Sequence, residues 1–221
     1  NAGLAQPNQN YAGRYASPEE STVYELGVKA QFEKGAFNVT LFDQTIEGFQ
    51  SSIFVGTGFV LANAGEQSTQ GIEFDSVYNP TDNWSFTLAA TLLDPVFDSF
   101  VGAQNVDGPV DLSGTKPAGI HEQSIIAGVT YNFEIGESTY GYIRADYLYE
   151  SEVHLVENLP DSLTREVSTF NASAGLSLEN GVNLQLWARN LNNDEYFQSA
   201  FPVPIQDGSF NAYPNQPSTY G

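Results

Sequence analysis

The chain has 221 residues, with 27 acidic against 7 basic side chains and a formal net charge of −20. This excess of acids argues against nucleic acid as a partner, because phosphates need lysine and arginine, and against attraction to anionic membrane surfaces. The chain has no cysteine, which excludes disulfides and thiolate chemistry. No run approaches the about 18 apolar residues of a membrane-spanning helix.

Apolar and polar residues alternate along most of the chain. The first such segment, 22–32 (TVYELGVKAQF), puts Leu26 and Val28 on one face and Glu25 and Lys29 on the other. The same rhythm recurs at 36–45, 70–78, 83–92, 125–133, 140–149, 168–179 and 181–189, and a ninth segment begins at 217–221. Successive side chains of a strand point to opposite faces, so each segment is predicted to be a strand with one apolar face. No convincing 3.6-residue stripe occurs, and we predict an all-β, antiparallel protein.

The connections between these segments alternate strictly between short and long. Short turns rich in Gly, Pro, Asn and Asp are predicted at 32–37, 78–84, 133–139 and 178–183, and long connections at about 48–60, 95–120, 150–166 and 197–217. Nothing in a sandwich requires every second connection to be long. In a membrane barrel the two rims face different compartments, and short turns at one rim with long loops at the other are the rule. The pattern therefore favours a transmembrane β-barrel.

Aromatic residues gather beside the short turns. Those that flank them are Phe32, Phe37, Tyr78, Trp84, Phe133 and Tyr140. This is where an interfacial aromatic girdle would lie. The alternative is that aromatic residues simply favour strands and cap the core of a sandwich.

Catalytic and metal-binding patterns are weak. His121 and His154 fall in or beside long connections and lack the spacing of metal ligands, so both are read as solvated loop residues. Acid pairs at strand ends give no reason to assign general acid–base roles. We predict a protein that is not an enzyme, with no catalytic residue, no metal and no cofactor.

Several segments resemble, in order, the C-terminal barrel of TonB-dependent receptors, the gated outer-membrane transporters. The stretch 17–32 carries Pro18, Glu19, Ser21, Tyr24, Glu25, Gly27 and Lys29 at the family's positions; NAGEQSTQGIE carries Asn63, Ala64, Gly65, Gly71, Ile72 and Glu73; and LQLWARNLNNDEYF carries Asn190, Leu191, Asp194 and Tyr196. FNVTLFDQTIEGFQ, DLSGTKPAGIHEQSIIAGVTYNF and PSTYG are similar to further strands of that barrel. The departures are the missing plug domain, energy-coupling box and final Phe, and NLNND in place of a commoner Asn-Leu-Phe-Asp spelling.

The resemblance implies a transport receptor of the bacterial cell outer membrane. On this reading residues 1–221 are a partial barrel domain, the C-terminal fragment of about eight or nine strands from a roughly 22-stranded plugged barrel, without the plug and the final strand. It would bind a scarce extracellular solute, such as siderophore-iron, cobalamin or an oligosaccharide, and import it to the periplasm. The implied partners are outer-membrane lipid, the plug of the same full-length chain, the TonB-type inner-membrane energy-coupling complex and the small solute.

Two groups of residues are candidate contacts in that setting. Aromatic residues of the long connections, with one histidine, are candidates for solute contact: Phe54, Phe59, Phe97, Phe100, His154, Phe201 and Phe210. The alternative is that these rings pack the loops onto one another. Charged residues of the polar face are predicted to face the lumen and pair with the plug, because a charge facing lipid would cost roughly 2–4 kcal/mol at midplane; these are Glu73, Arg144, Asp146 and Arg189.

Two other functions stay open at this point. A passive porin-like channel would share the barrel and lack a plug and a coupling box. A soluble β-sandwich acting as an adhesin or sugar-binding module would bury the apolar faces beneath a second sheet and would need no detergent. Burial of Phe170, Leu176, Leu184 and Leu186 beneath such a sheet would therefore exclude the transporter.

Overall fold

The computed structural model describes residues 16–55, 58–63, 65–105, 108–157, 163–203, 206 and 208–221. Nine of its strands form one antiparallel sheet in the order β1-β2-β5-β6-β9-β10-β11-β12-β15. Their bounds are β1 Glu20–Phe32, β2 Gly35–Glu47, β5 Glu66–Tyr78, β6 Trp84–Ser99, β9 Gln123–Ile135, β10 Thr139–His154, β11 Thr164–Ser177, β12 Asn183–Arg189 and β15 Thr219–Tyr220. Among the described residues, no helix has the length and apolarity needed to cross a membrane.

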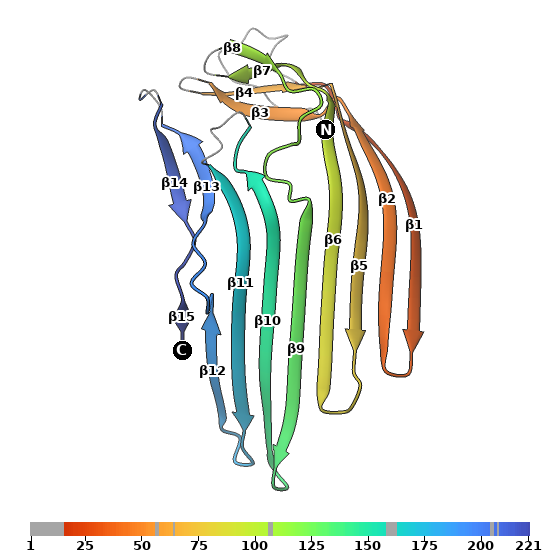
Figure 1. Cartoon of the computed structure of the whole chain (residues 1–221), viewed down its shortest axis with the longest axis vertical. Coiled ribbons are helices and arrows are strands. Elements are labelled where there is room, and N and C mark those ends of the chain that lie inside the picture. Colours follow the sequence, from red (N-terminus) through yellow and green to blue (C-terminus); the bar gives the residue numbers. More distant parts are fainter. Residues whose placement is uncertain are drawn as a thin grey trace.

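The sheet is a curved wall of long strands (Figure 1). Most of its strands have 13 to 16 residues, whereas strands of soluble proteins usually have about five or six. The short turns, which cover residues 33–34, 79–83, 136–138 and 178–182, lie together at one end, and the long connections lie at the other. The predicted strands and the predicted alternation of turns are confirmed.

The strand register joins the apolar faces of neighbouring strands into one. Leu41 on β2 opposes Leu26 on β1 and Ile72 on β5. On β11, Ala174 opposes Ile143 on β10 and Leu186 on β12. Because paired residues of neighbouring strands point to the same side, the apolar residues cover one face of the whole sheet, here called the apolar face, and the opposite side is the polar face.

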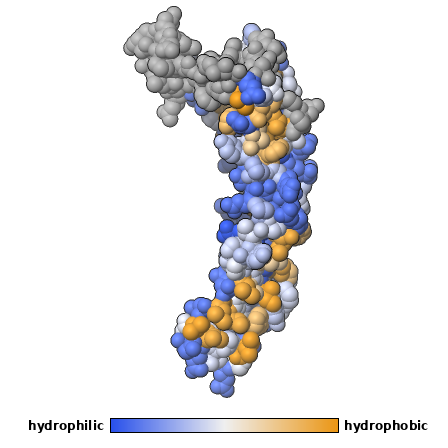
Figure 2. Space-filling model, turned by 90° about the vertical axis from the view of Figure 1, so that its left-hand side faces the viewer, coloured by the Kyte–Doolittle hydropathy of each residue, from blue (hydrophilic) through white to orange (hydrophobic). Residues whose placement is uncertain are grey.

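No second sheet packs on the apolar face within the described part of the chain. Leu26 is 71% exposed and Leu186 is 72% exposed, and Phe170 and Leu184 are also exposed. Seen from the side, the molecule is a narrow slab with hydrophobic side chains gathered toward the end that carries the short turns and a second group near the long connections (Figure 2). Each square ångström of such surface costs about 25 cal/mol in water, so a soluble β-sandwich does not describe this molecule.

The apolar face has the height of a membrane. On β6 it runs from Trp84 to Leu92, which is eight residue steps of about 3.4 Å along the strand. For a strand tilted by about 40°, this length spans about 21 Å along the membrane normal. The value is close to the roughly 25 Å apolar band of outer-membrane barrels. By strand alternation, the predicted girdle residues Phe32, Phe37, Tyr78, Trp84 and Phe133 lie on this face at the end with the short turns. Tyr140 does not: its partners, Glu134 and Ser177, place it on the polar face.

The predicted long connections are not structureless. They contain three hairpins, made of β3 Gln50–Val55 with β4 Gly58–Asn63, β7 Val101–Asn105 with β8 Gly108–Asp111, and β13 Phe197–Pro202 with β14 Phe210–Pro214. Beside them, Phe97, Phe100, Ala103 and Leu112 form a small buried cluster, against which Phe49 and Val110 pack. We call these six residues the loop core.

Candidate functional site

Charged and polar side chains gather on the polar face, where Arg144 and Asp146 form its best-defined ion pair. Arg144 donates from Nε to Asp146 Oδ2 at 2.8 Å and from Nη2 to Asp146 Oδ1 at 2.5 Å. The guanidinium also reaches the Thr130 hydroxyl at 3.4 Å. Two parallel bonds between a planar guanidinium and a carboxylate fix both side chains, so this part of the wall presents a neutralised, rigid polar surface.

Gly128 provides the room for this pair. A Cβ at Gly128 would lie 2.6 Å from Thr87 Oγ1 and 2.9 Å from Asp146 Oδ1. Contacts this short do not occur for real Cβ atoms, so a larger residue would push the carboxylate away from its partner. The glycine in the polar row of β9 thus makes room for a side-chain pair on the neighbouring strand.

The other two predicted lumen residues also lie on the polar face. Glu73 lies between Thr40 and Thr91 in the strand register and is exposed. Arg189 places its guanidinium carbon 5.3 Å from the centre of the Trp187 ring, a distance suited to a cation–π contact. The pairing of these residues with a plug stays a prediction.

A second cluster lies at the end of the polar face that carries the long connections. Arg165 donates from Nη2 to His121 Nε2 at 2.5 Å, and Glu150 Oε2 lies 3.2 Å from the same nitrogen and 3.7 Å from Arg165 Nη2. His121 Nδ1 contacts the carbonyl oxygen of Ser151. A ring that accepts at Nε2 carries its proton at Nδ1, and this proton is then donated to Ser151.

The surroundings of His121 show that the prediction of a solvated loop residue was wrong. Its side chain is only 10% exposed, so it is a packed member of the wall and not a solvated loop residue. Arg165 also donates from Nη1 to the carbonyl oxygen of Gln198 on β13 at 3.4 Å. The cluster of His121, Glu150 and Arg165, here called the rim cluster, therefore connects the sheet to the β13–β14 hairpin. Sequence spacing could not reveal it, because its members come from three separate segments.

The asparagine-rich segment after β12 replaces part of the strand ladder. Asn192 accepts from Phe170 N at 3.0 Å and donates to the Ser168 carbonyl, while Asp194 accepts from Ser168 N at 2.7 Å. Asn190 accepts from Asp194 N and donates to the carbonyls of Asp194 and Gln216. Asn190 and Asn193 both have a φ of 51°, a region that asparagine tolerates better than most residues. The segment thus supplies hydrogen-bond partners for backbone groups of β11 that lie beyond the end of β12.

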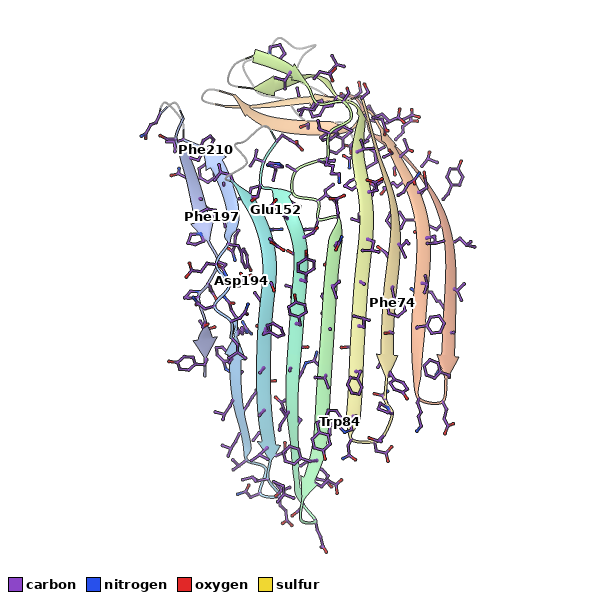
Figure 3. All side chains as sticks on the ribbon, in the orientation of Figure 1. Phe74, Trp84, Glu152, Asp194, Phe197 and Phe210 are labelled. Atoms are coloured by element: carbon purple, nitrogen blue, oxygen red, sulfur yellow. The ribbon has the colours of Figure 1, made fainter. Side chains whose placement is uncertain are left out.

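The predicted solute-contacting aromatics have different surroundings. Phe97 and Phe100 are 1% and 2% exposed within the loop core, so their rings leave almost no surface for a solute. Phe201 is 39% exposed and lies 5.8 Å from the Tyr213 ring across the β13–β14 hairpin. Phe210 opposes Pro202 at one end of the same hairpin, and Phe197 opposes Pro214 at its other end (Figure 3).

The remaining candidates are less constrained. His154 is exposed at the end of β10, and its carbonyl oxygen accepts from Gly119 N at 2.9 Å. Phe54 and Phe59 are register partners on β3 and β4, and their side chains lie outside the residues whose side chains the structure describes. Across the described ranges, no three His, Asp or Glu side chains are grouped so that they could hold a metal ion.

Burial shifts the pKa of one acid in the long connections, Glu157. Glu157 accepts from Ala118 N at 2.7 Å. Burial raises the pKa of the Glu157 carboxyl above its ordinary value, while the bond from Ala118 and the nearby His154 oppose the shift. The docking of these two connections on one another therefore depends on a titratable group.

The whole-chain comparisons agree with this geometry. A family model described as "TonB dependent receptor-like, beta-barrel" matches residues 2–191. No curated protein matches the chain.

Solved structures share the fold at low sequence identity. The ferric yersiniabactin uptake receptor FyuA from Yersinia pestis superposes with a TM-score of 0.73 at 17% identity, over 91% of this chain and 29% of that chain. The siderophore receptor PiuA from Acinetobacter baumannii superposes with a TM-score of 0.71 at 20% identity, over 96% of this chain and 29% of that chain. The ferric preacinetobactin receptor BauA from Acinetobacter baumannii superposes with a TM-score of 0.69 at 18% identity, over 99% of this chain and 31% of that chain. The chain thus spans less than a third of these proteins.

Proposed function

The chain belongs to the TonB-dependent receptor-like β-barrel family of the bacterial outer membrane, and we propose that it is part of the wall of a receptor that imports a scarce solute. On this proposal the solute binds at the cell surface and passes to the periplasm with energy from a TonB-type inner-membrane complex. On this proposal the whole receptor transports the solute and catalyses no reaction, and this chain supplies part of its wall. Siderophore-bound iron is the first solute class to test, because several structural neighbours are described as receptors for it.

The observation that supports this proposal most strongly is the two-faced sheet. Nine strands carry one continuous exposed apolar face, and the polar face holds four of the six lysines and arginines in the described residues: Lys29, Arg144, Arg165 and Arg189. Charges on the lumen side face water, whereas the same charges on the other side would face hydrocarbon. On this proposal, a plug from the same full-length chain fills the lumen and contacts Glu73, Arg144, Asp146 and Arg189.

We propose that the solute meets the wall at the rim cluster and the β13–β14 hairpin. Arg165 is a permanent cation that is partly exposed and is bonded to both the wall and the hairpin. An anionic group on a solute would compete with Gln198 and His121 for its N–H donors. Exposed Phe201 and His154, with half-buried Phe210, would add contacts from the loops. Phe54 and Phe59 stay in this proposal as sequence candidates, and Phe97 and Phe100 do not, because the loop core buries them.

Uptake by the full-length receptor tests this function. Cells that depend on it for a radiolabelled ferric siderophore should lose uptake when the gene is deleted, and should also lose it when the proton gradient is collapsed. Arg165→Gln should lower uptake about tenfold or more if one charge-assisted bond of about 1.5–3 kcal/mol is lost, with Lys34→Gln in the short turn as a matched charge control. Uptake that persists without the proton gradient would favour the passive porin-like channel.

A further inference from the structure

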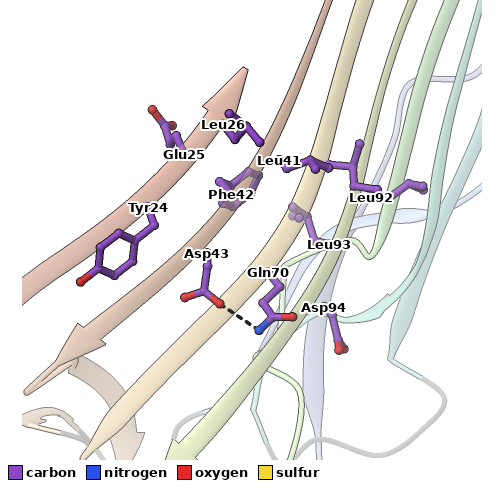
Figure 4. Close-up of a pocket in the computed structure, with 12 residues that line it drawn as sticks. Tyr24, Glu25, Leu26, Leu41, Phe42, Asp43, Gln70, Leu92, Leu93 and Asp94 are labelled. Atoms are coloured by element: carbon purple, nitrogen blue, oxygen red, sulfur yellow. Dashed lines mark hydrogen bonds between the residues drawn. The ribbon is translucent and has the colours of Figure 1, made fainter. Parts of the chain in front are cut away.

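A groove of about 720 Å³ crosses four strands of the sheet, β1, β2, β5 and β6. By register, two rows of side chains on the apolar face form its banks (Figure 4). With the molecule oriented as in Figure 1, the lower bank, nearer the short turns, consists of Leu26, Leu41, Ile72 and Leu92, and the upper bank, nearer the long connections, of Tyr24, Asp43, Gln70 and Asp94; Figure 4 shows the two banks from the opposite end. The row between them, Glu25, Phe42, Gly71 and Leu93, belongs to the polar face, so its backbone forms the floor.

The two banks differ sharply in chemistry. The lower bank is aliphatic and exposed, and it continues the apolar face toward the short turns. In the upper bank Gln70 donates to Asp43 Oδ2 at 2.8 Å. The side chain of Asp94, the other register partner of Gln70, has no hydrogen bond or ion pair with the described residues. The boundary between hydrocarbon and headgroups therefore falls inside this groove.

The apolar face carries unbalanced negative charge above the groove. Glu47 opposes both Glu20 and Glu66 in the strand register, and directly opposed like charges destabilise a sheet. None of the described lysines and arginines shares this face: four lie on the polar face, Lys34 lies in a short turn and Lys116 pairs with Glu122 in a long connection. A cationic headgroup that approaches this end of the apolar face therefore meets acids and no described lysine or arginine.

A second groove on the same face lies next to the first. It measures about 500 Å³, spans strands from β5 to β11, and thus shares β5 and β6 with the first groove. Small Ala127 and Ala145 lie between the larger Phe86 on one side and Tyr147 and Phe170 on the other. Its lining is almost wholly apolar, which suits an acyl chain.

We propose that these two grooves bind one membrane lipid whose headgroup carries an ammonium group. Asp43 and Asp94 receive the ammonium, the Gln70 amide orients it, and the aliphatic bank with the second groove receives the acyl chains. An amine fits better than a chelated metal, because carboxylates of the upper bank are not grouped as metal ligands in the described residues. The inference rests on the proposed membrane receptor, and it identifies the lipid partner of its wall.

The test compares two lipids with the same acyl chains. The full-length receptor in detergent is titrated with dioleoyl phosphatidylethanolamine, which has an ammonium group, or with dioleoyl phosphatidylglycerol, which has none, and bound lipid is counted by native mass spectrometry. We expect the first lipid to bind about tenfold more tightly, as two partly exposed ion pairs predict. Asp43→Asn with Asp94→Asn should reduce this preference to less than about twofold. Asp75→Asn, on the polar face of β5, should leave it unchanged.

Three results would overturn the proposal. They are equal binding of both lipids, a preference that survives in the double variant, and a preference for phosphatidylglycerol that appears with Mg²⁺ and disappears with a chelator, which would indicate a metal bridge instead. Because the readout is lipid binding, it is independent of solute uptake. Loss of the lipid preference with normal uptake would reject the lipid site alone, and lipid preference without any energy-dependent uptake would reject the transport function alone.

Discussion

The wall and the loop end of this molecule are held together by different interactions. In the wall, backbone ladders carry the structure and the apolar side chains stay exposed, as with Leu26 and Leu186. At the loop end, side chains do this work, through the loop core around Phe97 and through the bonds that Asn190 and its neighbours make to the backbone. Lipid takes the place of a hydrophobic core around the wall, whereas the loop end must form a core from its own side chains.

The largest effect is expected in the loop core. Phe97→Ala removes a ring that is 1% exposed and packs 5.0 Å from the Phe100 ring, which should cost about 3–5 kcal/mol of loop stability. Amide hydrogen exchange should accelerate at Leu112 and Gly114, which donate to Phe100 and Phe97, and should stay slow in β9 to β11. Phe97→Leu is the matched control and should retain most of the protection. Equal acceleration in the wall would show that the two regions are not independent.

The next effect contrasts the two faces of β6. Leu88→Lys places a charge at the middle of the apolar face and should lower the free energy of unfolding from lipid vesicles by about 2–4 kcal/mol. Thr91→Lys places the same charge on the polar face opposite Glu73, where water and an acid surround it. Its cost should stay below about 1 kcal/mol. Urea unfolding of the full-length receptor measures both, and equal losses would contradict the assignment of faces.

A smaller effect is expected at the end of β12. Asn190→Ala removes three hydrogen bonds of the side chain and a residue suited to a φ of 51°, and should cost about 1–3 kcal/mol. Asn190→Gly keeps the backbone freedom and loses only the bonds, so it should be the milder of the two. Thermal melts of the receptor in detergent would rank them. Equal melting of both variants would mean that backbone strain contributes nothing here.

The smallest effect concerns pH. The pKa of Glu157 is raised in the folded state above its ordinary value of 4.5. An acid whose pKa is raised on folding contributes fully to the stability of the fold at a pH below its pKa in the unfolded state. This contribution is lost as the pH rises through its pKa in the folded state. The Ala118 amide should therefore exchange relatively faster toward neutral pH, after correction for the intrinsic rate. Glu157→Gln keeps an acceptor for Ala118 N and should remove this dependence; an unchanged pH profile would assign it to another group.

The sequence predicts the wall far better than the loop end. Eight strands and the start of a ninth follow from alternation alone, because one face must meet lipid along the whole strand, and the family match and the register confirm them. Tyr140 was placed wrongly in the girdle because proximity to a turn does not fix which face a residue occupies; alternation puts it on the polar face with Tyr142. The three loop hairpins were not predicted, since their short apolar runs show no two-residue rhythm.

The candidate site shows the same division. Glu73, Arg144, Asp146 and Arg189 could be placed on the polar face from alternation, whereas the rim cluster could not. His121, Glu150 and Arg165 meet only because a bulge in β10 between Glu150 and Val153 and a long connection bring them together. Burial of Phe97 and Phe100 likewise depends on how β7 and β8 fold back, which residue types alone do not specify.

The central claim is that the two faces of each long strand contact lipid and water in alternation. The 221 residues have no cysteine, so once any cysteine elsewhere in the full-length receptor is replaced, single cysteines can be introduced one at a time at residues 86–92 of β6 and spin-labelled. Collision rates with oxygen, which concentrates in lipid, and with a water-soluble nickel complex should then oscillate with a period of two residues. Oxygen maxima are expected at 86, 88, 90 and 92, and nickel maxima at 87, 89 and 91. Rates without alternation, or with the opposite phase, would contradict it.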